Sequence, residues 1–294
     1  MILTFVISFT IAGIYKLLGG TGTGTIGFTL LSAVYMFIPT ISVLIVEKII
    51  HKEKFKTDLL ISFKINKWFF VAWLLMPVIM FFTIGVNLII PDIAYNPEMT
   101  GLIDRIKNVL PAEQIDQMQQ SLKALPINLV WLTLLQGMIA GITINAIAAF
   151  GEELGWRGFL LNAFKAMSFH KASIIIGIIW GIWHAPLILM GHNYPQHPQV
   201  GVLMMVVLCV LWTPFYLYIT IKSRSVIASA IMHGTMNATA SISIITISGG
   251  NDLTSGIAGL AGFIALSIFL IGLFIFDRYV NKDKILTNKL INYL

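Results

Sequence analysis

Apolar stretches long enough to cross a lipid bilayer recur along the whole of this chain. A transmembrane helix needs about 20 consecutive, mainly apolar residues, and soluble proteins carry about 25% charged residues. Here only 11% of the residues are charged. We identify eight apolar segments, at residues 2–18, 26–46, 68–90, 127–150, 172–190, 200–221, 225–247 and 254–276. The pattern predicts an all-α, polytopic protein of the cell membrane with about eight transmembrane helices.

Basic residues alternate between the connections that join these segments. The connection 48–67 contains six lysines, basic residues flank the turns at 165–171 and 222–224, and four more lie in the C-terminal tail. The turn 192–199 has none. Because Lys and Arg favour the cytoplasmic side, the alternation predicts that both termini are cytoplasmic. Topology thus accounts for the net charge of +6, and no nucleic-acid partner is expected.

Two outer connections carry further expectations. Residues 91–126 contain apolar residues at helical spacing, which predicts a short amphipathic helix on the outer surface. His192 and His197 belong to the uncharged turn "HNYPQHPQ" and are expected to be solvated loop residues.

A cluster of three ionisable residues interrupts the apolar sequence "AIAAFGEELGWRGFLLNAFK" at 146–165. Glu153 and Arg157 are four residues apart, so they share a helix face and can form an ion pair. Glu152 points about 100° away from Glu153 around the helix axis, so its carboxylate remains available for a functional role. The cluster could also simply mark the cytoplasmic end of the fourth span. A bend near Gly151 would place it deeper in the membrane.

Two later segments contain polar residues that favour a functional site. His184 follows Trp180 by four residues in "WGIWHAP", and His233 and Asn237 share one face in "HGTMN". Ionisable residues inside membrane segments usually face the bundle interior and mark function, although a single histidine can also serve helix packing. Two pairs of small residues would let helices approach closely: Gly137 with Gly141, and Gly177 with Gly181.

This set of side chains suits hydrolysis in a membrane cavity. Glu152 could act as the general base towards a water molecule, with His184 holding that water. His233 and Asn237 could donate hydrogen bonds to the oxyanion of a tetrahedral intermediate. Glu152, His184 and His233 also match the ligand number of a catalytic zinc site. The spacing alone leaves both chemistries open, so the cofactor is unknown and a divalent metal such as zinc remains an alternative.

The three motifs "GEELGWRG", "WGIWHAP" and "HGTMN" resemble those of the CAAX-protease and bacteriocin-processing family, also called the abortive-infection family, of intramembrane endopeptidases. The resemblance implies a family-like catalytic core at 127–247, preceded by transmembrane helices and an outer loop at 1–126. A last helix and a cytoplasmic tail follow at 248–294. The resemblance also implies an eight-helix fold whose site opens towards the cytosol.

By motif position, the resemblance makes Glu152 the catalytic carboxylate and His184 its water-positioning partner, with His233 and Asn237 at the oxyanion. The second motif departs from the family pattern, because Trp180 lines the expected cavity where phenylalanine is usual. The larger ring is expected to narrow the cavity and so to affect the size of the substrate that fits.

We therefore expect an endopeptidase that acts on a membrane-associated protein or peptide. One alternative is a non-catalytic immunity or scaffolding protein of the same fold. A transporter that uses the same buried polar groups is a weaker alternative, because its polar residues should extend through the full depth of the membrane. The motifs favour no particular branch of the family, no prenyl recognition and no oligomeric state.

Overall fold

A computed structural model describes residues 1–51, 59–99, 101, 103, 112–281 and 283–294. Almost all of the regular structure in this part of the chain is helical, which confirms the all-α fold. The exception is a pair of three-residue strands, β1 (Ile93–Tyr95) and β2 (Ile247–Gly249), which pair antiparallel.

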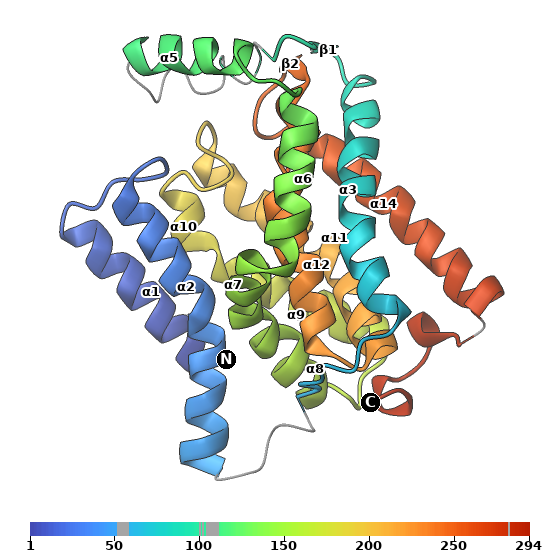
Figure 1. The fold of residues 1–294 in the computed structure, drawn as a ribbon. Coiled ribbons are helices and arrows are strands. Elements are labelled where there is room, and N and C mark those ends of the chain that lie inside the picture. Colours follow the sequence, from blue (N-terminus) through green and yellow to red (C-terminus); the bar gives the residue numbers. More distant parts are fainter. Residues whose placement is uncertain (52–58, 100, 102, 104–111, 282) are drawn as a thin grey trace.

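The helices form one bundle, shown in Figure 1. Its N-terminal part consists of α1 (Ile2–Leu17), α2 (Ile26–Leu44), the π-helix η1 (Ile45–His51), α3 (Lys67–Asn87) and α5 (Ala112–Lys123). Its central part consists of α6 (Leu129–Ile142), α7 (Ile144–Glu153), the π-helix η2 (Leu154–Phe159), α8 (Leu160–Ala163), α9 (Phe169–Trp183), α10 (Ala185–Leu189), α11 (Pro198–Ser223), α12 (Val226–Thr239) and α13 (Ile242–Ile245). Its C-terminal part consists of α14 (Leu260–Ile275), the π-helix η3 (Phe276–Asn281) and the short 3₁₀ helices η4 (Ile285–Thr287) and η5 (Leu290–Asn292).

The chain is a multi-pass membrane protein. Within the described residues, four helical segments are long and apolar enough to cross a bilayer, at 26–50, 67–87, 198–223 and 260–281. A fifth results if the bent pair 129–142 and 144–163 is counted as one span. The predicted number of eight is not confirmed, because the helices in three predicted spans are short. α1, α9 and α12 have 16, 15 and 14 residues, fewer than the roughly 20 that a straight crossing needs.

The fourth predicted span is longer than expected and bends at a different residue. The axis turns by 53° where α6 ends and α7 begins, at Thr143, and not near Gly151. Helical backbone then continues through η2 and α8 to Ala163, so the expected boundary near residue 150 is wrong. At 1.5 Å per residue, Glu152 lies about 16 Å from the end of this segment. The charged cluster therefore belongs to the interior of the bundle and does not mark a helix end.

One end of the bundle gathers the connections 59–66, 164–168 and 223–225 with the C-terminal residues 283–294, and we call it the basic end (Figure 1). The amide of Val226 donates to the carbonyl of Leu60 at 2.9 Å. The amide of Leu290 donates to the carbonyl of Met167 at 3.0 Å, and Lys222 pairs with Asp283. The described parts of the connections and tail that were predicted to be cytoplasmic thus share one end of the molecule.

The opposite end, the strand end, consists of 88–99, 190–197 and 246–259, with the two strands among them (Figure 1). The hydroxyl of Tyr194 donates to the carbonyl of Ala258 at 2.7 Å. The expected amphipathic helix is present as α5, which extends across this end; residues 104–111 of that prediction lie outside the described residues.

The predicted close approach of helices at small residues is confirmed. A Cβ atom on Gly177 of α9 would lie 2.6 Å from Cα of Val210 in α11. A Cβ atom on Gly137 of α6 would lie 2.7 Å from Cγ2 of Thr239 in α12. Only glycine allows helices to come this close. Besides joining α9 to α11 and α6 to α12, close approach also joins α12 to α7, because a Cβ atom on Gly234 would lie 2.6 Å from the backbone nitrogen of Ala146.

Candidate active site

A cavity of about 420 Å³ lies between these helices, and its walls bring the predicted site residues together. Glu152 comes from α7, His184 from the junction of α9 and α10, and His233 and Asn237 from α12. Trp180 also lines the cavity, as the second motif indicated. The four polar groups therefore share one cavity although up to 85 residues of chain separate them.

Glu152 is held at the cavity wall by two indole groups. One carboxylate oxygen, Oε2, accepts a hydrogen bond from Nε1 of Trp180 at 2.8 Å and a longer one from Nε1 of Trp156 at 3.4 Å. Only 3% of the residue is exposed. Because indole N–H groups donate and never accept, this setting accommodates the carboxylate in a largely apolar wall and fixes its orientation.

Glu153 forms the centre of a buried ionic cluster. Its Oε1 accepts from Nη1 of Arg157 at 2.9 Å, so the ion pair indicated by the four-residue spacing is present. The same oxygen lies 2.8 Å from Nδ1 of His233. Glu153 and Arg157 are fully buried and His233 is 3% exposed. The contact between α7 and α12 thus links the structural ion pair to a residue of the cavity wall.

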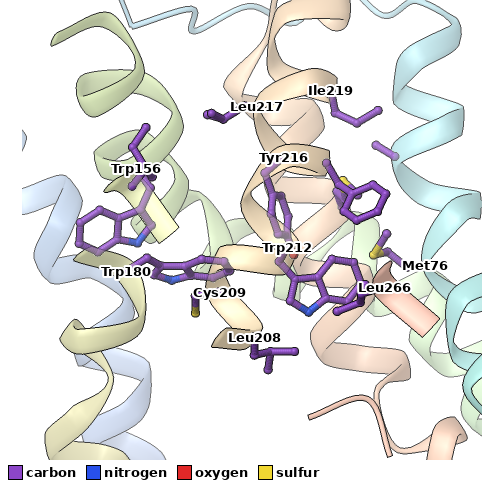
Figure 2. Close-up of a cluster of buried hydrophobic side chains, with 14 of the residues drawn as sticks. Met76, Trp156, Trp180, Leu208, Cys209, Trp212, Tyr216, Leu217, Ile219 and Leu266 are labelled. Carbon is purple, nitrogen blue, oxygen red and sulfur yellow. The ribbon is translucent and has the colours of Figure 1, made fainter. Parts of the chain in front are cut away.

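Aromatic rings enclose the guanidinium group of Arg157. Its Cζ lies 4.1 Å from the ring centroid of Trp180 and 4.4 Å from that of Tyr216, and Nη2 donates to Oγ1 of Thr213 at 3.4 Å. Cation–π contacts of this kind strengthen when water is excluded. Figure 2 shows Trp156 and Trp180 together on one side, facing Tyr216 and Trp212 of α11. The rings of Trp180 and Tyr216 thus hold Arg157 in place beside the cavity.

His184 is fixed in one tautomer. Its Nδ1 lies 2.8 Å from the carbonyl oxygen of Trp180. A carbonyl oxygen can only accept, so Nδ1 carries the hydrogen, and Nε2 of the neutral ring is left as an acceptor. His184 therefore offers a lone pair to the O–H group of a water molecule.

Asn237 and one residue that the sequence analysis missed supply amide groups. Asn237 lines the cavity with an exposed side chain that has no hydrogen-bond partner in the described part of the chain. Asn145 of α7 also lines it and donates from Nδ2 to the carbonyl of Gly234 at 3.4 Å. Because Asn145 precedes Glu152 by seven residues, both lie on one helix face. That spacing is the signal that could have identified it.

The outer histidines are not the simple solvated residues that were expected. His192 is partly buried, lines the cavity and packs against Phe28 with ring centroids 6.0 Å apart. Nδ1 of His197 lies 2.6 Å from Oδ1 of Asp252. The backbone amide of Gln196 donates to Oδ2 of Asp252 at 2.7 Å. The two connections are thus joined to each other beside the cavity.

The arrangement does not fit a three-ligand metal site. In the described ranges, no three His, Cys, Asp or Glu side chains come close enough to hold one metal ion. The described side chains of Glu152, His184 and His233 are therefore not grouped as the alternative zinc site would require.

Comparison with known proteins covers this same region. Residues 126–239 match the family described as Type II CAAX prenyl endopeptidase Rce1-like. Within this segment, the chain is similar to that family. The matched segment contains the four predicted site residues Glu152, His184, His233 and Asn237.

A curated protein, CAAX prenyl protease 2 of Methanococcus maripaludis, is similar to this chain over a short stretch. The two are 47% identical over 49 residues, which is 16% of this chain. The chain spans only 18% of that relative's length in this match.

Proposed function

We propose that this protein is an intramembrane endopeptidase in which Glu152 activates water for attack on a peptide bond. The observation that carries the proposal is the single cavity that Glu152, His184, His233 and Asn237 line within the membrane bundle. The family match at 126–239 and the protease named in the curated relative support the same reaction class. In this proposal, residues 127–247 form the catalytic core.

The first step is the formation of a nucleophile from water. Oε2 of Glu152 is occupied by two indole donors, so Oε1 is the oxygen that takes the proton. Nε2 of His184 accepts the second O–H of the same water and orients it. The water oxygen then bonds to the carbonyl carbon of the substrate while the carbonyl π electrons move to its oxygen.

The second step is stabilisation of the oxyanion that results. Nδ2 of Asn237 can donate to it, and so can Nε2 of His233 when that ring is doubly protonated. After Glu152 has taken the proton from water, Glu153 and the oxyanion carry the negative charges that face Arg157 and a doubly protonated His233. The carboxylate of Glu153 lies 2.8 Å from Nδ1 of His233 and so fixes the orientation of this ring.

The reaction ends when the C–N bond breaks and Glu152 returns its proton to the leaving amine. One peptide bond and one water thus give one carboxylic acid and one amine. Since the site lies inside a multi-pass bundle, we infer that the substrate is a membrane-associated protein or peptide.

The test is cleavage of a membrane-tethered peptide by the purified full chain in lipid nanodiscs, with new termini identified by mass spectrometry. We expect cleavage by the wild type and by Glu113→Gln, whose carboxylate lies on α5 outside the cavity, and none by Glu152→Gln. Equal cleavage by Glu152→Gln would refute the assignment. If no peptide is cleaved and ion flux in liposomes depends on Glu152 and His184, the transporter alternative gains support. Neither cleavage nor flux would favour the scaffolding alternative.

A further inference from the structure

A second hollow in the molecule lies between α3 and α14, on the perimeter of the bundle. It is an apolar groove of about 600 Å³, and the buried Phe215 of α11 contributes to its lining. Among the described residues, none lines both this groove and the cavity around Glu152. Figure 1 shows α14 beside α3 near the strand end and diverging from it towards the basic end. The groove is therefore a separate site.

The walls of the groove belong to two membrane-spanning segments. α3 and the segment 260–281 are both long and apolar enough to cross a bilayer. Two large apolar wall residues, Phe82 of α3 and Ile268 of α14, are 39% and 46% exposed. The described part of the chain leaves these side chains uncovered, so their partner must come from the surrounding bilayer.

The dimensions of the groove fit one hydrocarbon chain. Its lining on α3 extends from Trp68 to Phe82, a distance of about 21 Å at 1.5 Å per residue. Over that length, the groove volume of about 600 Å³ corresponds to a cross-section of about 30 Å². A helix with its side chains is about 10–12 Å wide, which gives a cross-section of about 80–110 Å². The groove is therefore too narrow for the helix of a protein partner, and it suits a single extended acyl chain.

Gly272 of α14 keeps the groove open between two aromatic contacts. The rings of Phe82 and Phe269 lie with their centroids 5.3 Å apart. Nearer the basic end, the rings of Trp68 and Phe276 lie 6.2 Å apart. At Gly272, which lines the groove between these pairs, a Cβ atom would have no neighbour within 4 Å. The absence of a side chain at Gly272 thus leaves room for a ligand.

The end of the groove that lies nearest the basic end carries a positive charge. Within the described chain, Lys67 is the only ionisable residue that lines the groove, and it is exposed and forms no ion pair. Its Nζ lies 5.7 Å from the ring centroid of Trp68. Nζ of Lys222 lies 5.2 Å from the same centroid, but Lys222 is paired with Asp283. The ammonium group of Lys67 is therefore available to an anion at this end of the apolar groove.

We propose that the groove between α3 and α14 binds one acyl chain of an anionic phospholipid, whose headgroup phosphate contacts Lys67. The apolar walls bind the chain, and the single cation at one end selects the headgroup. One lysine near an anionic lipid raises its affinity by about fivefold. The bound chain fills the space where α14 diverges from α3. This lipid site goes beyond the proposed endopeptidase function and does not depend on it.

Fluorescence quenching by brominated lipid tests the site, because bromine on an acyl chain quenches only those tryptophans that it contacts. The full chain is placed in nanodiscs that contain equal amounts of phosphatidylglycerol and phosphatidylcholine, and the bromine is carried by one lipid or the other. The difference between the wild type and Trp68→Phe gives the quenching of Trp68, which lines the groove.

We expect Trp68 to be quenched more strongly by brominated phosphatidylglycerol, with a preference of about fivefold over phosphatidylcholine. Lys67→Gln should lose this preference. Lys289→Gln is the matched control, because Lys289 is also exposed at the basic end but does not line the groove, and it should keep the preference. Equal quenching of the wild type by the two brominated lipids would overturn the proposal, and so would an unchanged preference in Lys67→Gln.

Filling the groove tests the position of the acyl chain independently of the charge. Gly272→Phe places a ring in the open space between α3 and α14, and it should reduce the quenching of Trp68 by brominated phosphatidylglycerol to the level seen with brominated phosphatidylcholine. Undiminished quenching in a folded Gly272→Phe protein would show that the chain lies elsewhere and would overturn the proposal. Cross-linking of two copies through α14 with exclusion of the brominated lipid would identify a second copy as the occupant, and this too would overturn it.

Discussion

Nδ1 of His233 lies 2.8 Å from Oε1 of Glu153, the same oxygen that Arg157 binds at 2.9 Å. The two adjacent glutamates therefore have separate tasks. Glu153 compensates the buried charge of Arg157 and orients His233, whereas Glu152 lines the cavity with its Oε1 free of indole contacts.

Removing the charge of Glu153 should destabilise the protein far more than removing that of Glu152. Glu153→Gln leaves Arg157 buried beside a neutral amide, and breaking a buried ion pair costs about 3–5 kcal/mol. Glu152→Gln keeps a side-chain oxygen that accepts from Trp180. In detergent, the melting temperature should fall clearly for Glu153→Gln and change little for Glu152→Gln. Equal melting temperatures would contradict this division of tasks.

Truncation of Asn237 should reduce turnover without unfolding the protein. One hydrogen-bond donor to the oxyanion raises kcat by a factor of about 10²–10³. The exposed side chain of Asn237 makes no hydrogen bond in the described structure, so its loss should not affect stability. We expect Asn237→Ala to lose about that factor in kcat and to keep its melting temperature. A rate within a few-fold of the wild type would remove Asn237 from the oxyanion site.

The close contact of α9 with α11 predicts sensitivity at Gly177. A methyl group there would meet the backbone of Val210 at 2.6 Å, whereas around Gly272 of α14 nothing lies within 4 Å. Overpacking costs about 1–3 kcal/mol. Gly177→Ala should lower the melting temperature and the matched substitution Gly272→Ala should not. The account of helix packing fails if the two variants melt alike.

His192, which lines the cavity at the strand end, should make the stability of the protein depend on pH. Burial lowers the pKa of His192 below its usual value of 6.5, because it disfavours the charged ring. Below pH 6.5 the unfolded chain then binds more protons than the folded one, so this stabilising contribution is complete above pH 6.5 and declines as the pH falls. Between about pH 7.5 and pH 5.5, wild-type melting temperature should fall more than that of His192→Gln. An identical decline in both proteins would show that His192 is not responsible.

The sequence predicted well those features that depend on local spacing. The four-residue interval placed Arg157 against Glu153, and the alternation of basic connections grouped the loops that share one end of the bundle. The three motifs identified Glu152, His184, His233 and Asn237, and these four residues line one cavity.

Other features depend on contacts between distant segments and could not be read from spacing. The bond between His233 and Glu153 exists only because α12 packs on α7. The bend at Thr143 was expected near Gly151, but Gly151 instead lets α7 approach α2, since a Cβ atom there would lie 2.6 Å from the carbonyl oxygen of Met36. Eight apolar segments suggested eight spans, yet helix breaks around the cavity shorten several of them.

The most direct measurement of the central claim is the single-turnover rate at which Glu152→Gln cleaves a membrane-tethered peptide, relative to the wild type. General-base catalysis contributes a factor of about 10²–10⁴ to the reaction rate, so the rate should fall by at least about a hundredfold. The melting temperature should stay close to that of the wild type. A folded Glu152→Gln protein that cleaves within a few-fold of the wild-type rate would contradict the claim that Glu152 activates the attacking water.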